Sequence, residues 1–232
     1  MISRQIDHTN LKPYATDKDI QRLCDEALIH KFRGVCVNPR HVTTARVHLD
    51  NRKCENDQYI AVIAVVGFPL GANQTHTKIQ EACHALSNGA EEIDVVWDLA
   101  AFKMQEYWAT LMELTKIVQA VLQKKPRTVI KVIVEECYLD SDELEKAFSV
   151  VASSGAHFIK TSTGMGPGNA KLSTIELWAN LRKLTDVDLG IKASGGIKTH
   201  YDAKRFIEAG ANVIGTSQGV SIVKEESNYA GH

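Results

Sequence analysis

The sequence predicts an α/β fold, a single parallel barrel built from eight strands and the helices between them. Short runs rich in Val and Ile recur through all 232 residues, and segments with helical periodicity separate most of these runs. A weak repeat, Gly-Ala-x-x-Ile, marks three helix-to-strand junctions. Strands that alternate with helices imply parallel pairing through right-handed crossovers, and eight units favour a closed barrel over an open doubly wound sheet.

The eight runs have the length and composition of buried strands. They are residues 2–7, 34–38, 60–67, 92–97, 128–135, 158–161, 189–193 and 213–216. No low-complexity segment or linker interrupts them. Because barrels of this kind reach about 250 residues as one unit, we expect residues 1–232 to form one domain, in which the polar segment 224–232 is a mobile tail.

Helix signals lie between the runs. Thr16 stands where its hydroxyl can cap a helix with apolar residues at helical spacing, and Gly34 can end that helix. Ser141 and Gly155 have the corresponding positions around a later helix. We therefore expect helices after the first and the fifth strand.

The phase of the strands is the most informative feature of the sequence. The repeat occurs at residues 89–93, 155–159 and 210–214, so that a glycine ends a helix and an isoleucine enters a strand. On five strands a charged residue follows an isoleucine directly. These charged residues are Asp7, Asp94, Lys131, Lys160 and Lys192. Since side chains alternate along a strand, the isoleucines would face the helices and the charges would converge inside the barrel.

Such lysines are suited to carbonyl chemistry. A buried ammonium either pairs with a carboxylate or loses its proton more easily than an exposed one. A lysine beside a second cation has a populated neutral amine, which can attack an aldehyde or ketone. Lys160 and Lys192 are the natural pair because they occupy matching segments of neighbouring strands, and Asp94 can shuttle protons. The pattern leaves open which lysine is the nucleophile, and one lysine alone would be read more simply as solvated.

Small residues follow the last three strands, at the end of a barrel where loops form active sites. They are Gly164, Gly166 and Gly168 after the sixth, Gly195 and Gly196 after the seventh, and Gly215 with Ser217 after the eighth. Glycine lets backbone N–H groups approach a phosphate, although a plain turn explains any one of them. Together they make a phosphate site a reasonable hypothesis.

Charge and motifs exclude several classes of protein. The 27 basic and 28 acidic residues give a formal net charge of -1, so we expect neither a nucleic-acid nor a membrane partner. The longest apolar stretch, residues 60–72, is too short to span a bilayer, which predicts a soluble cytoplasmic protein. Nine histidines form no HxH or HExxH motif, and neither a Walker motif nor a dinucleotide fingerprint is present, so we expect no metal and no cofactor.

The cysteines indicate reduced thiols, because they are odd in number and none form CxxC. They are Cys24, Cys36, Cys54, Cys83 and Cys137. Cys36 ends the second strand, where it could join the polar groups at the mouth and react with aldehydes. A buried core thiol is the simpler interpretation.

Seven segments, spread in order over nearly the whole chain, resemble the deoxyribose-phosphate aldolase family. They are IDHTNLKP from Ile6, VCVNP from Val35, EIDVV from Glu92, KVIVE from Lys131, FIKTSTG from Phe158, GIKASGG from Gly190 and IGTS from Ile214. The resemblance implies a TIM barrel and a metal-independent Schiff-base aldolase. Such an enzyme reversibly cleaves 2-deoxy-D-ribose 5-phosphate to acetaldehyde and D-glyceraldehyde 3-phosphate in deoxynucleoside breakdown.

The resemblance also assigns roles to residues. Lys160 would be the Schiff-base nucleophile, Lys192 the cation that lowers its pKa, and Asp94 the acid/base partner acting through water. A supporting polar network would contain Asp7, Lys131 and Cys36. The substrate and its phosphate would be bound by Gly164, Gly195, Gly196, Gly215 and Ser217. We expect small-molecule partners only, sugar phosphates and aldehydes, and a homo-oligomer, most simply a dimer.

Two positions depart from the family pattern, and two rival functions remain. Met165 stands where some members have a lysine, and Tyr229 is followed by Ala-Gly-His rather than ending the chain, so we leave Tyr229 outside the site. The first rival is another Schiff-base aldolase or a transaldolase. The second is a phosphate-binding barrel without catalysis, which the intact Lys160, Lys192 and Asp94 disfavour.

Overall fold

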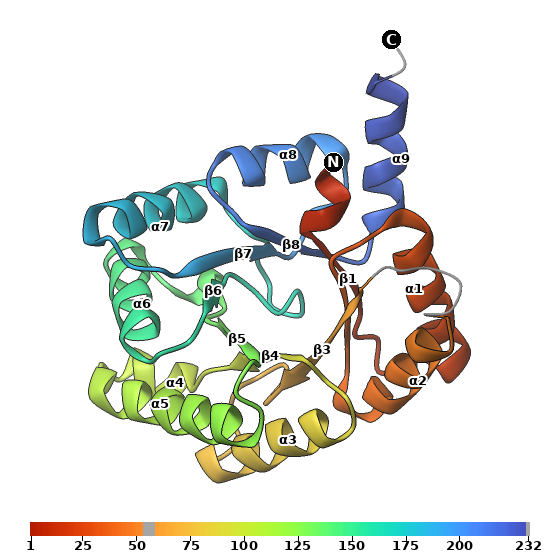
Figure 1. Cartoon of the computed structure of the whole chain (residues 1–232). Helices are drawn as coiled ribbons and strands as arrows, with labels where there is room; N and C mark the ends of the chain where they lie inside the picture. The colour runs from red at the N-terminus through yellow and green to blue at the C-terminus, as the bar shows by residue number, and fades with distance from the viewer. Residues whose placement is uncertain (53–58, 231–232) are drawn as a thin grey trace.

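The strands form a closed parallel barrel in the order β1 to β8 (Figure 1). The computed structural model describes residues 1–52 and 59–230. The strands are β1 Ile6–Asn10, β2 Gly34–Val37, β3 Ala61–Val66, β4 Glu92–Val96, β5 Val129–Ile133, β6 Phe158–Lys160, β7 Gly190–Ser194 and β8 Val213–Thr216. β8 pairs with β1, with Ile214 opposite Ile6, which closes the sheet and excludes the open alternative.

Helices surround the barrel (Figure 1). They are α1 Asp17–His30, α2 Val42–Arg52, α3 Thr75–Ser87, α4 Leu99–Lys103, α5 Tyr107–Lys124, α6 Ser141–Ser153, α7 Leu172–Thr185, α8 His200–Glu208 and α9 Gly219–Ala230. Short 3-10 turns are η1 Ile2–Gln5, η2 Pro39–His41 and η3 Glu136–Tyr138. Within the described ranges, no helix has the length and apolar character needed to cross a bilayer.

The structure corrects several predicted boundaries. The first strand starts at Ile6, because the residues before it form η1. Thr16 caps α1 as expected, in a capping box with Asp19. That helix ends at His30 and not at Gly34, which lies inside β2. Asp140, whose carboxylate accepts the Glu143 N–H, caps α6 in place of the predicted Ser141.

The predicted tail is helical over most of its length. Residues 224–230 belong to α9, and the last two residues lie outside the described part of the chain. The mobility of this segment stays a prediction. Cys54 also lies outside the described residues, and the other four cysteines are free thiols, as expected.

The predicted phase of the strands is confirmed. The isoleucines that precede the charged residues are fully buried in the main core, between strands and helices. The repeat glycines Gly89, Gly155 and Gly210 have φ of +106°, +82° and +116°. A residue with a side chain rarely adopts these values, so glycine is needed where each helix turns into its strand.

The interior of the barrel has an apolar part and a charged part. Leu11, Cys36, Ile63 and Val65 form a separate buried cluster with Phe68 against it. Cys36 is fully buried in this cluster, which supports the core-thiol interpretation, and its place in the polar network of Asp94, Lys160 and Lys192 stays a prediction. Burial raises the pKa of the Cys36 thiol.

Candidate active site

Asp94 is the centre of the charged interior, and three lysines share its carboxylate. Oδ1 accepts a hydrogen bond from Lys131 Nζ at 2.8 Å. Oδ2 accepts one from Lys160 Nζ at 2.9 Å and one from Lys192 Nζ at 2.8 Å. Register explains the convergence, because Asp94 pairs with Lys131 across β4 and β5, and Lys160 with Lys192 across β6 and β7. The structure therefore brings together the charges that the strand phase predicts.

Further charged side chains contact the lysines of this group. Lys192 Nζ also donates to Asp7 Oδ2 at 2.5 Å, and Lys131 Nζ to Glu92 Oε2 at 2.5 Å. Arg33 bridges the two carboxylates, with Nη1 2.7 Å from Asp7 Oδ1 and Nη2 2.6 Å from Glu92 Oε1. The sequence reasoning missed Arg33 and Glu92. Glu92 carries a signal, since it lies two residues before Asp94 and shares its strand face.

Electrostatics hold most of the cluster ionised. Burial alone would raise the pKa of Asp94, but the three lysine ammonium groups outweigh it and keep that pKa well below its usual value. The pKa of Asp7 falls to about 2, because Lys192 and Arg33 overcome its burial. Burial alone would lower the pKa of Lys192, but Asp7 and Asp94 raise it above the ordinary lysine value. Lys192 therefore remains a cation at neutral pH.

The cluster has one cation more than it has carboxylates. Asp7, Glu92 and Asp94 face Arg33 and the three lysines. Lys160 has one carboxylate contact, whereas Lys131 and Lys192 have two each. Of the three lysines, Lys160 is therefore the one held by the fewest carboxylates.

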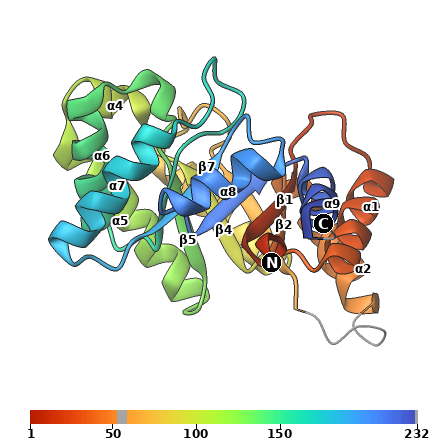
Figure 2. The same ribbon diagram turned by 90° about the horizontal axis from the view of Figure 1, so that it is seen from above.

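A cavity of about 400 Å³ opens at the carboxyl ends of the strands, and Lys160 lies at its floor. Lys160 is 3% exposed, and Lys131 and Lys192 are fully buried and do not line the cavity. The loops after β1 and β6 project from this end of the barrel (Figure 2). A small molecule in the cavity can therefore reach the amine of Lys160.

The predicted phosphate-binding residues line the same cavity, namely Gly164, Gly195, Gly196, Gly215 and Ser217. A Cβ on Gly215 would lie 3.1 Å from Lys192 Cε and 3.0 Å from Ser194 Cβ. Glycine at this position leaves room for the charged lysine beneath it. Gly166 and Gly168 are not part of the lining, because they pack against Glu135 and Cys137.

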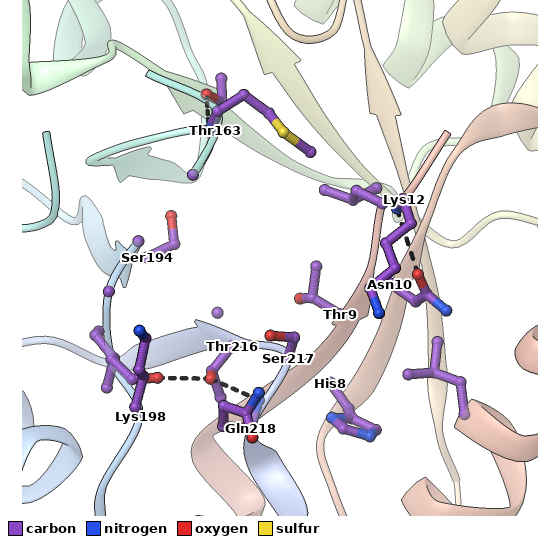
Figure 3. A pocket seen from close by; sticks show the side chains of 18 of the residues that line it. His8, Thr9, Asn10, Lys12, Thr163, Ser194, Lys198, Thr216, Ser217 and Gln218 are labelled. Carbon is purple, nitrogen blue, oxygen red and sulfur yellow. Dashed lines mark hydrogen bonds between the residues drawn. The ribbon is translucent and has the colours of Figure 1, made fainter. Parts of the chain in front are cut away.

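Several lining residues were missed by the sequence reasoning. They come from β1 and the loop after it, from α1 and from the loops after β6, β7 and β8. Figure 3 labels His8, Thr9, Asn10, Lys12, Thr163, Lys198 and Gln218, and Arg22 and Glu26 of α1 also belong to the lining. Met165 also lines the cavity. A signal was present for those in β1 and the loop after it, since they lie within the segment IDHTNLKP.

No group of three His, Cys, Asp or Glu side chains arranged to hold a metal ion occurs among residues 1–52 and 59–230. The charged groups of the interior are instead paired with one another.

The fold and the cavity define an α/β barrel in which a lysine on the sixth strand, Lys160, is open to a small molecule at the carboxyl ends of the strands. The chain matches the DeoC/LacD family aldolase profile over residues 2–225. It belongs to the DeoC/LacD aldolase family.

Individual relatives resemble nearly the whole chain. It is 44% identical over 227 residues to the deoxyribose-phosphate aldolase of Thermococcus gammatolerans, covering 98% of this chain and 97% of the relative. It is 44% identical over 231 residues to the deoxyribose-phosphate aldolase of Thermotoga maritima, covering 99% and 88%. The tetrameric deoxyribose phosphate aldolase structure from Aeropyrum pernix has a TM-score of 0.87 and 31% identity, covering 98% of this chain and 92% of that one.

Proposed function

We propose that this protein is an aldehyde-lyase that reversibly cleaves 2-deoxy-D-ribose 5-phosphate to acetaldehyde and D-glyceraldehyde 3-phosphate, through a Schiff base on Lys160. The observation that carries the proposal is the placement of Lys160, whose amine contacts Asp94 and also lines the cavity. The names of the similar proteins from Thermococcus gammatolerans and Thermotoga maritima support this substrate. The reaction would serve the breakdown of deoxynucleosides.

The neutral amine of Lys160 adds to C1 of the open-chain sugar, and loss of water gives a protonated imine. Removal of the proton from the C3 hydroxyl then breaks the C2–C3 bond. The electron pair of that bond moves to C2 and is held as an enamine, while C3 to C5 leave as glyceraldehyde 3-phosphate. Protonation at C2 and addition of water release acetaldehyde and restore Lys160.

Asp94 stabilises the cation in this cycle. Its Oδ2 lies 2.9 Å from Lys160 Nζ, so the carboxylate that holds the ammonium also faces the positive nitrogen of the imine. We assign proton transfer to Asp94 and Lys192 with a water, because both contact one another at 2.8 Å beside the reacting amine. Asp7 and Lys131 fix these two groups in place.

The phosphate of the substrate would bind where the loops after β7 and β8 meet. Gly195, Gly196, Gly215 and Ser217 line this side of the cavity, and Lys198 lies two residues after the glycine pair. Backbone N–H groups near glycine and a nearby cation are typical of phosphate sites in barrels.

The first test is reduction of the imine. The protein is incubated with deoxyribose 5-phosphate and EDTA, treated with borohydride, and mapped by peptide mass. We expect an adduct on Lys160 and release of acetaldehyde, no adduct in K160M, and an unchanged adduct in K204M, which alters an exposed lysine of α8. An adduct on Lys192 would overturn the assigned roles, and no adduct with any aldehyde would favour the binding-protein alternative. Cleavage of a different sugar phosphate would favour another Schiff-base aldolase.

We also propose that the protein acts in the cytoplasm as a homo-oligomer, with a dimer as the simplest state. The tetrameric relative from Aeropyrum pernix supports oligomer formation, and the net charge of -1 supports small-molecule rather than nucleic-acid partners. Light scattering during gel filtration measures the mass directly, and a monomer at micromolar concentration would contradict this proposal.

A further inference from the structure

Most charged residues that line the cavity are already paired. Lys160 contacts Asp94, Arg22 contacts Asp19 at 2.7 Å, and Glu26 contacts His8 at 2.7 Å. The two remaining charged lining residues are Lys12 and Lys198. Neither makes an ion pair with a residue in the described part of the chain, so both cations are available to a ligand.

The closure of the barrel brings Lys12 to the phosphate end of the cavity. β1 pairs with β8, and His8 lies opposite Thr216. The loop that carries Lys12 therefore emerges beside the loop that carries Ser217. In Figure 3, Lys12 and Lys198 lie on opposite sides of the opening, with Thr9 and Ser217 between them.

The backbone of Lys12 is held while its side chain stays exposed. Its N–H donates to Asn10 Oδ1 at 3.3 Å, its carbonyl accepts the Ala15 N–H at 3.1 Å, and Pro13 follows it. Its ammonium lies 5.9 Å from the centre of the Tyr14 ring. A fixed backbone and a long flexible side chain suit a cation that must reach a phosphate and release it.

We infer that Lys12 is a specificity residue that contacts the substrate phosphate and makes the enzyme prefer phosphorylated over free sugars. This inference rests on the proposed aldolase function. It also explains how phosphate can be held when the loop after β6 presents Met165, an uncharged side chain, to the cavity. Lys12 and Lys198 would then place one positive charge on each side of the phosphate dianion.

The test compares K12Q with K18Q, a control that removes an exposed lysine of α1 outside the cavity lining. The readout is the ratio of kcat/KM for deoxyribose 5-phosphate to kcat/KM for free deoxyribose. A charge-assisted contact predicts a fall in this ratio of about tenfold in K12Q. We expect partial recovery in K12R and no change in K18Q.

Binding of inorganic phosphate, measured by calorimetry, supplies a second readout that needs no catalysis. We expect about tenfold weaker binding in K12Q than in K18Q. Equal ratios and equal phosphate affinities in K12Q and K18Q, or no measurable phosphate binding by the unchanged protein, would overturn the inference. Loss of borohydride trapping in the unchanged protein would instead overturn the aldolase function, so the two failures are distinguishable.

Discussion

At the scale of single residues, the three lysines around Asp94 differ in their carboxylate contacts and in their access to the cavity. Lys131, Lys160 and Lys192 all donate to Asp94, yet only one of these three lines the cavity. Lys192 contacts two carboxylates, which hold its pKa above the ordinary value, so it is a cation beside Lys160 at neutral pH.

Replacement of Lys192 by methionine therefore removes a positive charge but leaves the amine that is accessible from the cavity in place. We expect K192M to form the Lys160 adduct more slowly, because the positive charge beside the reacting amine is then missing. K192R keeps the charge and should form the adduct at a rate closer to that of the unchanged protein. A trapping rate in K192M equal to that of the unchanged protein would contradict this role.

At the scale of an element, two adjacent carboxylates hold the loop between β6 and α7. The side chain of Glu135 accepts the N–H of Thr163 at 3.2 Å and also its hydroxyl, near the start of the loop. Glu136 Oε1 accepts the Lys171 N–H at 2.7 Å, at the end of the loop. The backbone of Glu135 has φ of +51°, which is unusual for a residue with a side chain. Residues 163–165, in the first half of this loop, line the cavity. The loop lies across the barrel in Figure 1.

Loss of either contact should loosen this loop without unfolding the barrel. We expect E135A and E136A to raise the KM for deoxyribose 5-phosphate several-fold, with a smaller change in kcat, since a buried hydrogen bond to a charged group contributes about 1.5–3 kcal/mol. Hydrogen exchange of a peptide covering residues 161–171 should become faster. E145Q on the exposed face of α6 is the control. Unchanged exchange in both variants would contradict the role of the pair.

At the scale of the whole molecule, local sequence features and long-range contacts differ in what they predict. The alternation of strands and helices, and the isoleucine phase that places Asp94 and Lys160 inside, are periodic and local, so the sequence shows them. The contacts of Arg33, Lys12 and Glu135 depend on which strands become neighbours, and on loops that meet only after β8 pairs with β1 or β5 with β6. No short-range pattern encodes such contacts. Helix ends were also missed where Asp140 competed with Ser141 as the cap.

The buried charges also link the stability of the barrel to pH. Asp7 has a pKa of about 2 in the folded protein against 3.8 ordinarily, and the pKa of Asp94 is also well below its ordinary value. Their stabilising contribution is present above about pH 4 and is lost as the pH falls toward 2, because the unfolded chain then binds protons that the folded protein does not. The raised pKa of Lys131 and Lys192 gives a contribution that is present at neutral pH and lost well above pH 10.

A single substitution tests this linkage. D7N leaves Arg33 and Lys192 each without one carboxylate partner, so we expect a loss of about 3–5 kcal/mol at pH 7. The difference in the free energy of unfolding between D7N and the unchanged protein should shrink as the pH falls from 4 to 2, since Asp7 then becomes protonated. E208Q removes the exposed 3.8 Å pair with Lys204 and should cost less than about 1 kcal/mol at any pH. Urea unfolding at several pH values measures the free energy of unfolding of both variants. If the loss in D7N is small at pH 7, or does not change with pH in the acid range, Asp7 does not hold the cluster together.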